Sequence, residues 1–447
     1  MKKSLSLLLV LLLASTMVFA QGTKDATGDD GKVTEIKIWS RVGGGREFEI
    51  ENLEEWNQTL GKDAGIRVVS EFFGSDYDDV LTLARNTGKL PDLFASRNKV
   101  EDWVASDSVM AIDDLPGGDA LVEKYSDYIV DGISRFDGKV YSIKNVANTF
   151  RLVANKTLLA KSGFDSLPET WEELRMMAKK VTKDNNSKKF GIAFPLKFGN
   201  NGEHFWRLCA IYGLSNTYGF ESWYNQSTSA YDFAALKPVF ELMREFQKDK
   251  SYLPGAEGLD NDTARAEFAA GNLAFMYAAS WDYGVYTSQF PIGDKFEWEV
   301  MEMPGTHEHT TPLSPGVRFV DAINKDTKVP LDKLFYFLDT YIYSDEYLGK
   351  AYEAGVFLPI MPSITSRVEG GITKQWSDFA PTDNDSVETP RPDSFVSIDG
   401  KSWPEVFMLI WSDPTMDIDS ALADLDRRYN AGLDKAIEKG DVDPSIY

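Results

Sequence analysis

The chain has 447 residues, of which 43% are hydrophobic and 26% charged, with 34 Gly and 19 Pro. This length exceeds what one hydrophobic core supports, and the composition excludes a collagen, a fully disordered chain and a bundle of membrane helices. The 70 acidic residues outnumber the 47 Lys and Arg and give a net charge of −23, which argues against a nucleic-acid partner; the single cysteine excludes an internal disulfide.

The first 20 residues have the pattern of an export signal. Two lysines precede an apolar run from Leu5 to Phe19, and small residues at the cleavage positions end at Ala20. The run is shorter than the ~20 apolar residues that span a bilayer, and no cysteine for a lipid anchor follows it. We therefore expect a cleaved signal peptide at 1–20, a disordered leader at 21–32, and a periplasmic protein that is not embedded in the membrane.

The first predicted elements alternate between strand and helix. Ile36 and Ile38 share one face of a strand, whereas Leu53, Trp56 and Leu60 recur at helical spacing. Strands that alternate with helices predict parallel βαβ units with both faces of the sheet covered. The predicted elements are, in chain order, a strand at 33–39, a helix at 53–60, a strand at 66–73, a helix at 80–84 and a strand at 91–95.

The alternation continues in the second third of the chain. Thr170 and Glu173 have the spacing of a capping box, and apolar residues follow at helical spacing as far as Val181. The other predicted elements are a turn at 137–139, strands at 140–143 and 150–154, helices at 233–243 and 331–338, and a surface loop at 380–392.

The histidines give no clear catalytic or metal site. His307 and His309 are two residues apart, and such side chains meet one ion only on a strand or a special loop. No G-x-S-x-G sequence accompanies His204, and the glycines at 43–45 lack the G-K-[S/T] ending of a phosphate-binding loop. An active site built from two carboxylates remains an alternative, although no spacing of the acidic residues points to such a pair. The sequence therefore predicts no catalytic residue, no metal and no cofactor.

Three tryptophans lie where a predicted element gives way to a loop. Trp39 ends the first strand, Trp281 follows a run of small residues, and Trp403 follows a turn. Ligands of parallel α/β sheets collect at such ends, and a sugar needs an aromatic surface for its C–H face and polar groups for its hydroxyls. The pattern suggests carbohydrate binding but is not specific to it, and core packing is the alternative for each tryptophan. The polar neighbours of the three tryptophans are Arg41, Asp282 and Asp399.

Four segments in order resemble the extracellular solute-binding proteins of bacterial ABC importers, in particular the large family (family 1) that captures sugars and oligosaccharides. The most specific segment begins at Asp137-Gly138-Lys139-Val140-Tyr141 and ends at Leu167-Pro168-Glu169-Thr170-Trp171-Glu172-Glu173-Leu174, with Asn155-Lys156 and Gly163 between. The other three are Ile36-Lys37-Ile38-Trp39, Gly88-Lys89-Leu90-Pro91-Asp92-Leu93, and Phe268-Ala269-Ala270-Gly271-Asn272-Leu273-Ala274-Phe275-Met276 followed by Ser280-Trp281.

The resemblance implies an α/β, two-lobed periplasmic-binding-protein fold with a hinge and a ligand cleft between the lobes. The chain would cross between the lobes more than once. The implied lobe one comprises 33–145 plus 285–325, and lobe two comprises 146–284 plus 326–447.

The resemblance also implies a set of ligand-binding residues on loops that face the cleft. Two departures affect the ligand: Ala154 replaces the usual tyrosine before Asn155, and 144–149 contains no acidic residue. Trp171 is expected in the core. The implied ligand contacts are Trp39, Ser40, Arg41, Ser96, Arg97, Asn145, Asn148, Glu203, His204, Trp281, Asp282, Arg318 and Trp403.

The sequence thus predicts a monomeric, non-enzymatic substrate-binding protein that captures a carbohydrate and delivers it to an inner-membrane ABC permease. Arg41, Arg97 and Arg318 leave a polyol, a phosphorylated polyol or an anionic sugar open as the ligand. An exported carbohydrate-active enzyme is an alternative of another class, and a solute-binding partner of a membrane sensor is a third.

Overall fold

The computed structural model describes residues 33–41, 45–74, 76–97, 100–197, 222–305, 311–316, 319–367, 371–382, 385–387 and 391–444. The predicted signal peptide and leader lie outside the described residues. So do Cys209, the three histidines and, among the predicted ligand contacts, Glu203 and Arg318. No helix within the described ranges is long and apolar enough to cross a membrane.

A five-stranded sheet is built mainly from the first part of the chain, in the order β2-β1-β3-β14-β4. β1 pairs in parallel with β2 along its full length and with β3 on its other side, as the alternation of strands and helices predicted. β14 joins from a distant part of the sequence and runs antiparallel to β3 and β4. The strands are β1 (Thr34–Arg41), β2 (Ile66–Phe73), β3 (Leu93–Phe94), β4 (Val109–Met110) and β14 (Ala322–Asn324).

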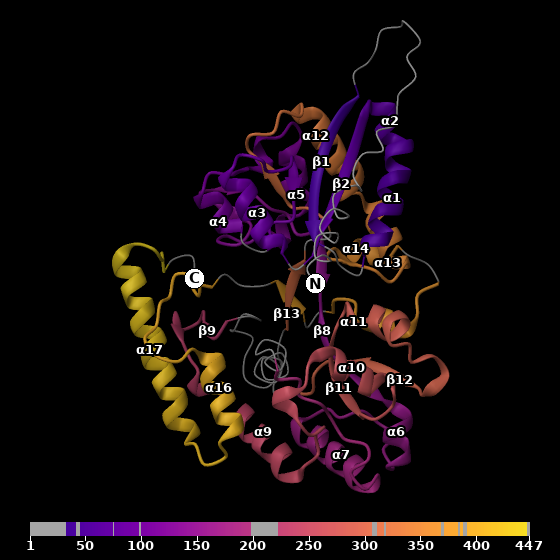
Figure 1. The fold of residues 1–447 in the computed structure, drawn as a ribbon, viewed down its shortest axis with the longest axis vertical. Coiled ribbons are helices and arrows are strands. Elements are labelled where there is room, and N and C mark those ends of the chain that lie inside the picture. The colour runs from indigo at the N-terminus through magenta and orange to yellow at the C-terminus, as the bar shows by residue number, and fades with distance from the viewer. Residues whose placement is uncertain are drawn as a thin grey trace, which may run out of the picture. The chain divides into compact units, whose positions relative to one another are not determined.

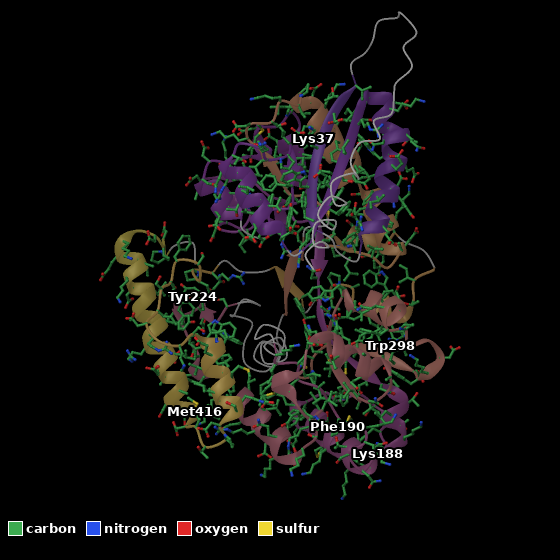
Figure 2. The ribbon with its side chains drawn as sticks, in the orientation of Figure 1. Lys37, Lys188, Phe190, Tyr224, Trp298 and Met416 are labelled. Carbon is green, nitrogen blue, oxygen red and sulfur yellow. The ribbon has the colours of Figure 1, made fainter. Side chains whose placement is uncertain are left out.

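Alternation along β1 sets the core of this sheet. Ile36 and Ile38 are fully buried, whereas Lys37 between them points away from the core and is exposed (Figure 2). Trp56 of α1 packs edge-on against Phe337, with ring centroids 5.0 Å apart. Figure 1 shows α1 and α2 alongside β2. The helices of this core are α1 (Arg46–Gln58), α2 (Leu60–Ala64), α3 (Tyr77–Asn86), α4 (Val100–Ala105), α5 (Gly118–Lys124), α12 (Leu331–Phe337), the π-helix η7 (Leu338–Ile342), α13 (Asp345–Glu353), α14 (Pro362–Thr365) and the short 3₁₀ turns η1 (Ile112–Asp114) and η2 (Ser126–Tyr128).

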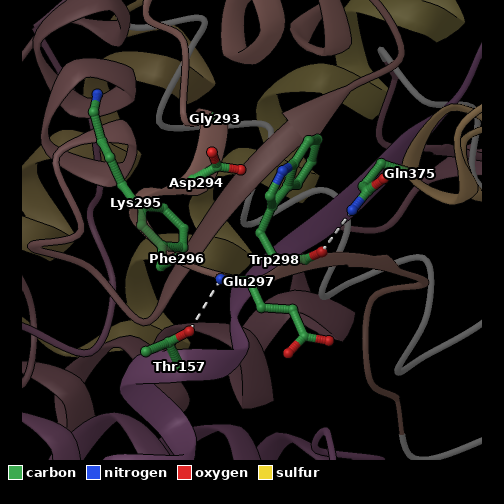
Figure 3. A pocket seen from close by; sticks show the side chains of 8 residues that line it. All are labelled: Thr157, Gly293, Asp294, Lys295, Phe296, Glu297, Trp298 and Gln375. Atoms are coloured by element: carbon green, nitrogen blue, oxygen red, sulfur yellow. Dashed lines mark hydrogen bonds between the residues drawn. The ribbon is translucent and has the colours of Figure 1, made fainter.

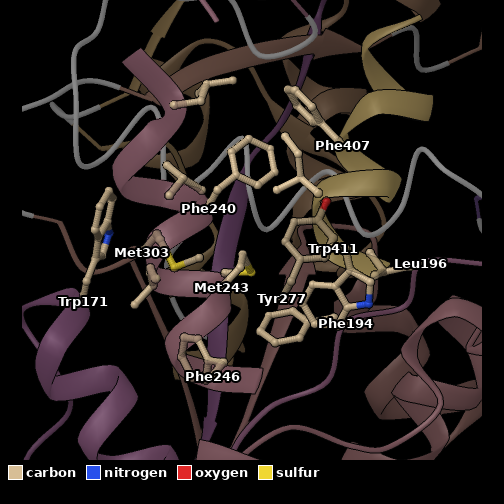
Figure 4. Packing of buried hydrophobic residues seen from close by; sticks show 14 of the residues in the cluster. Trp171, Phe194, Leu196, Phe240, Met243, Phe246, Tyr277, Met303, Phe407 and Trp411 are labelled. Carbon is tan, nitrogen blue, oxygen red and sulfur yellow. The ribbon is translucent and has the colours of Figure 1, made fainter. Parts of the chain in front are cut away.

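A second sheet is antiparallel, in the order β11-β8-β12. Leu152 and Ala154 of β8 belong to one hydrophobic core and Val153 to another, so both faces of this strand are covered. Figure 4 shows the larger core, where Phe240 and Phe407 meet edge to face. The strands are β8 (Phe150–Asn155), β11 (Phe275–Ala279) and β12 (Trp298–Met301).

Helices cover the second sheet. The predicted capping box at the start of α7 is present: Thr170 Oγ1 accepts from the Glu173 N–H, and Glu173 accepts from the Thr170 N–H. Trp171 is buried in the core, as predicted. The helices are α6 (Lys156–Lys161), α7 (Trp171–Asp184), α9 (Lys237–Asp249), α10 (Asn261–Ala269), α11 (Asp282–Gly284), α15 (Lys374–Asp378), α16 (Trp403–Ser412), α17 (Ile418–Lys439), the π-helix η5 (Val285–Gln289) and the 3₁₀ turns η3 (Ala234–Leu236), η4 (Ala256–Gly258) and η6 (Gly293–Lys295).

A four-stranded sheet, in the order β15-β7-β13-β16, contains the connections between the two larger sheets. β7 leads directly into β8, and β13 lies between β12 and β14 in the chain, so the chain passes more than once from one larger sheet to the other. The strands are β7 (Val146–Asn148), β13 (Thr311–Gly316), β15 (Leu358–Pro359) and β16 (Asp385–Val387); two small hairpins pair β5 (Arg135–Phe136) with β6 (Lys139–Val140) and β9 (Tyr224–Asn225) with β10 (Ala230–Tyr231).

The lobe boundaries stay a prediction, but the two cores bear on them. The core of the first sheet includes side chains from 334–360, which the sequence analysis placed in lobe two. β12 at 298–301 pairs with β8 of the second sheet, although the sequence analysis placed it in lobe one. Helical spacing predicted the helix at 331–338, but it does not encode which sheet that helix covers.

Candidate functional site

The ends of β1 and β3 lie at one edge of the first sheet and are joined by one buried tyrosine. The Tyr77 hydroxyl donates to the Trp39 carbonyl at 2.9 Å and accepts from the Ala95 N–H at 3.1 Å. Burial raises the pKa of Tyr77 well above its usual value, so the hydroxyl stays protonated and keeps both bonds. This edge is therefore preorganised without any ligand.

The three predicted contacts at the end of β1 differ in exposure. The Trp39 ring is half-buried and lies 5.0 Å from the Phe73 ring, centroid to centroid. Ser40 is buried and donates to the Phe319 carbonyl at 2.8 Å, so its hydroxyl is used inside the fold. Arg41 is exposed. Of the three, Trp39 and Arg41 have surface available to a ligand.

A buried carboxylate organises the end of β3. Asp321, directly before β14, accepts the Ser96 N–H and the Ser96 hydroxyl, each at 2.7 Å. Its Oδ2 also accepts from the Ser142 hydroxyl at 2.7 Å and from Lys144 Nζ at 2.5 Å. Burial alone would raise the pKa of Asp321, but the Lys144 ammonium and these hydrogen bonds outweigh it and hold the pKa below its usual value. Ser96 is thus held by the cluster rather than exposed to a ligand.

Arg97 follows Ser96 in the chain but differs from it in exposure and in backbone conformation. Its backbone has a φ of 61°, in the left-handed region that non-glycine residues rarely adopt. Its side chain is exposed, with Nε 3.6 Å from Asp78 Oδ1. The unusual backbone turns an exposed cation out of the end of β3.

The predicted contacts in the first connection are mostly engaged with the fold. Asn145 is buried. Its side-chain Nδ2 donates to the Ile342 carbonyl at 2.7 Å, and its backbone carbonyl accepts from the Ile360 N–H at 3.1 Å. Asn148 is half-buried on β7, opposite Ser314 of β13. Asn145 therefore positions the connecting strands, and Asn148 keeps part of its surface.

Trp281 follows β11 at the edge of the second sheet where β7 enters β8. Register places Ala279 opposite Phe150, and the Ser280 N–H donates to the Thr149 carbonyl at 2.9 Å. The Trp281 ring packs edge-on against Phe150, with centroids 5.7 Å apart, yet Trp281 is 47% exposed. Among the tryptophans that the structure describes, it alone is exposed. The indole is held in place but leaves surface open.

Asp282 and Trp403 are placed differently from the ligand contacts that the sequence predicted. Asp282 is 1% exposed and pairs with Arg265 Nη2 at 2.5 Å. Trp403 is half-buried at the first turn of α16, with its ring 5.1 Å from Phe407 and 5.8 Å from Trp223. Trp403 packs against the core of the second sheet, and the buried Asp282 has almost no surface open to a ligand.

Sequence reasoning missed the buried ion pairs next to the connections. Arg151 of β8 makes a two-pronged pair with Asp385, at 3.0 and 2.6 Å, and Lys144 pairs with Asp321. The partners are far apart in the chain, so no local spacing marks them. The available signal was Arg151 inside the otherwise mostly apolar sequence of β8, because a buried cation needs a partner. Lys144, in the polar segment before β7, carried no such signal.

Two open pockets lie away from these residues. One, of about 450 Å³, is lined by 293–298 with Thr157 and Gln375; there Thr157 Oγ1 accepts from the Glu297 N–H and Gln375 Nε2 donates to the Trp298 carbonyl (Figure 3). This first pocket lies at the opposite end of β8 from Trp281. At the pocket end Asn155 of β8 pairs with Trp298, whereas at the other end Phe150 pairs with Ala279. The other lies between α7 and α9. Neither contains a predicted contact. No metal-binding group of His, Cys, Asp or Glu occurs among the described residues.

Comparison with known proteins identifies relatives of the whole arrangement. Residues 55–380 match the family model described as "Bacterial extracellular solute-binding protein", and no curated protein sequence matches. Among solved structures, the sugar-binding protein MalE from *Xanthomonas citri* is similar, with a TM-score of 0.69 and 15% identity over 92% of this chain and 100% of that chain.

Two further structures are similar to nearly the same extent. The GacH receptor of *Streptomyces glaucescens*, determined unliganded and with acarbose, has a TM-score of 0.67 and 16% identity over 90% of this chain and 98% of that chain. The cyclic alpha-maltosyl-1,6-maltose binding protein from *Arthrobacter globiformis* has a TM-score of 0.67 and 15% identity over 90% and 99%. These likenesses confirm the predicted two-lobed α/β fold.

Proposed function

Because this chain belongs to the family of bacterial extracellular solute-binding proteins, we propose that it captures a carbohydrate and delivers it to the permease of an ABC importer. The observation that carries the carbohydrate assignment is Trp281. Its indole is 47% exposed, at the end of a fully buried strand and next to the connections between the two larger sheets.

An exposed but anchored indole suits a sugar. The face of an aromatic ring carries partial negative charge, and the C–H groups of a sugar ring are polarised positively. The Phe150 ring contacts the indole at nearly a right angle and restrains it, so binding costs little side-chain entropy. Two of the similar structures support an oligosaccharide as the class of ligand, since acarbose and cyclic maltosyl-maltose, which their descriptions name, are oligosaccharides.

The first sheet would supply the polar partners. Trp39 offers a second aromatic surface at the end of β1, while Arg41 and Arg97 present exposed guanidinium groups that donate to hydroxyl oxygens. In this proposal a ligand that touches both sets of residues stabilises a closed state, since it binds that state better than the open one. Glu203, His204, Arg318 and Asn148 remain proposed contacts.

The family and the sequence support the remaining parts of the proposal. In this proposal the protein performs no covalent chemistry, is exported through cleavage of the predicted signal peptide, is not lipid-anchored and acts as a monomer in the periplasm. Its partners are the carbohydrate and an inner-membrane permease.

A charged ligand is the second candidate, and the two exposed arginines favour it. Arg41 and Arg97 stand out in a chain of net charge −23, and guanidinium groups bind carboxylate or phosphate in pairs of hydrogen bonds. Affinity for an anionic sugar would fall as salt is raised, whereas affinity for a neutral sugar would not.

A thermal-shift panel tests the proposed function. We expect at least one of maltose, maltotriose, xylobiose, cellobiose, raffinose, glucuronate and sorbitol phosphate to raise the melting temperature, because a ligand that binds only the folded state stabilises it. New reducing ends in the same incubations would instead reveal a carbohydrate-active enzyme.

Truncating the indole tests the site. Trp281→Ala is expected to weaken binding of the stabilising sugar about 30-fold, since a central aromatic contributes about 2 kcal/mol. Met176→Ala, at an exposed apolar residue of α7, is the matched control and should leave affinity unchanged. Wild-type affinity in Trp281→Ala would contradict the site.

A further inference from the structure

The segment after β11 is fixed on both sides of Trp281. Before it, the Ala279 N–H donates to Asp282 Oδ2 at 2.9 Å, and the Ser280 N–H donates to the Thr149 carbonyl at 2.9 Å. After it, the Tyr283 hydroxyl accepts from Thr373 Oγ1 at 2.9 Å. Asp282 thus closes a tight loop with Trp281 inside it.

Asp282 is tied to α10 below the loop. Its Oδ1 lies 2.5 Å from Arg265 Nη2, and its side chain is 1% exposed. Arg265 Nη1 also donates to Asp262 Oδ1 at 3.1 Å, at a carboxylate that is 63% exposed. The guanidinium therefore bridges a buried and an exposed acid, and only the buried one touches the loop that carries Trp281.

We propose that Asp282 and Arg265 are positioning residues that hold Trp281 in its ligand-binding orientation, and that protonation of Asp282 loosens this hold and weakens sugar binding. The inference rests on the proposed function of Trp281 as the sugar-binding surface. It gives Asp282 a supporting role instead of the direct ligand contact that the sequence predicted, because a side chain this deeply buried has no surface to offer a sugar.

The charged groups around Asp282 set the direction of the pH effect. Those that face it are Arg265 and Asp262 of α10 and Tyr286 of η5. Burial raises the pKa of Asp282 to about 6, against the opposing effect of Arg265 and the Ala279 N–H. The carboxylate therefore loses its charge as the pH falls through about 6, and the attraction to Arg265 is lost with it.

The same pKa separates positioning from stability. A pKa raised on folding gives a stability contribution that is present below the unfolded pKa and is lost as the pH rises through about 6. The charged form at neutral pH thus does not stabilise the fold, and Asp282→Asn should leave the melting temperature at about pH 7.5 within about 3 °C of the wild type. A purely structural role would instead lower it.

Fluorine NMR of the ligand-free protein labelled with 5-fluorotryptophan tests the inference, with Trp281→Phe assigning the resonance. We expect the Trp281 resonance of the wild type to titrate with a midpoint near pH 6, and that of Asp282→Asn to be displaced and independent of pH. Asp262→Asn is the matched control, because it removes the exposed partner of Arg265, and it should titrate like the wild type. An unchanged Trp281 resonance in Asp282→Asn overturns the inference.

Calorimetry extends the test to binding. For each sugar of the panel that stabilises the protein, wild-type affinity is expected to fall about tenfold from pH 7.5 to pH 5, and that of Asp282→Asn to stay low throughout. Equal pH dependence in both proteins also overturns the inference. If Trp281→Ala keeps full sugar affinity, the assignment of Trp281 as the sugar-binding surface fails instead, and the fluorine result still decides whether Asp282 positions the indole. If no sugar of the panel raises the melting temperature, the proposed function itself fails.

Discussion

A buried ion pair lies in the region where the chain passes between the larger sheets. Arg151, at the start of β8, donates to both carboxylate oxygens of Asp385 and to the carbonyls of Phe150 and Ala380. Both side chains of the ion pair are 1% exposed. Desolvation of two charges is costly, so the net stability of such a pair is small, but the loss of one partner leaves the other uncompensated.

Removal of that carboxylate should therefore be severe. Asp385→Ala is expected to lower the free energy of unfolding by about 3 kcal/mol, as measured by urea denaturation. Asp184→Ala, which breaks the exposed pair with Lys180 on α7, is the control and should cost less than about 0.5 kcal/mol. Equal effects of the two substitutions would show that the buried pair contributes nothing specific.

At the residue scale, the sequence predicted the position of Trp281 at the end of a strand but not the burial of its neighbour Asp282. An aromatic after a small-residue strand predicts a residue at a sheet edge, and the structure places Trp281 there. The same reasoning predicted Asp282 as a ligand contact, because acids near tryptophans suit sugar hydroxyls. Its partner Arg265 comes from the preceding helix α10, and no spacing rule reveals that the carboxylate turns inward.

The ends of elements carry the candidate site, and long-range pairing brings them together. β14 enters the first sheet from more than two hundred residues away, and its register beside β3 sets Asp321 against Ser96. Lys144 reaches the same carboxylate from the segment before β7. The end of β3, the start of β14 and the first connection are thus joined at one buried charge.

The cluster around Asp321 predicts that the fold loses stability as the pH falls. A lowered pKa means that Asp321 stabilises the fold above the usual aspartate pKa, and that this contribution is lost as the pH falls through the lowered value. Asp321→Asn, which leaves Lys144 buried without its counter-ion, should cost about 3 kcal/mol above about pH 5. The cost should shrink below about pH 4.

Urea denaturation over this pH range measures the effect, with Asp114→Asn at an exposed pair as the control. If Asp321→Asn lowers the free energy of unfolding only slightly at neutral pH, or lowers it more at acidic pH, the stabilising role of the Asp321 carboxylate is contradicted.

Among the elements, local signals were the reliable ones. The capping box at Thr170 predicted the start of α7, and alternation predicted β1 and β2. The strand predicted at 140–143 is reduced to β6 at Lys139–Val140, and beyond it Ser142 and Lys144 donate to Asp321. Hydrophobic periodicity does not reveal where a strand loses its pairing partner, because pairing depends on backbone groups of a distant segment.

For the whole molecule, the class of fold was predictable and the assignment of later segments was not. Motifs in a fixed order, behind a predicted export signal, predicted a two-lobed α/β protein, and the family and structural comparisons agree. Elements of the second half divide between two cores: Phe337 packs with the first sheet, and Phe407 with the second. Which core a later segment joins depends on the sheet to which the connecting strands carry the chain. The sequence does not reveal this, because it is set by the long-range pairing of β7 with β13 and β15.

We propose that a carbohydrate binds between Trp281 on one side and the ends of β1 and β3 on the other. A crystal structure of the complex with the most stabilising sugar of the panel would show the contacts themselves. We expect a sugar ring stacked on the Trp281 indole, with hydroxyls in hydrogen-bond distance of Arg41 or Arg97. A sugar bound elsewhere, such as the pocket between Thr157 and Gln375, with Trp281 untouched, would contradict it.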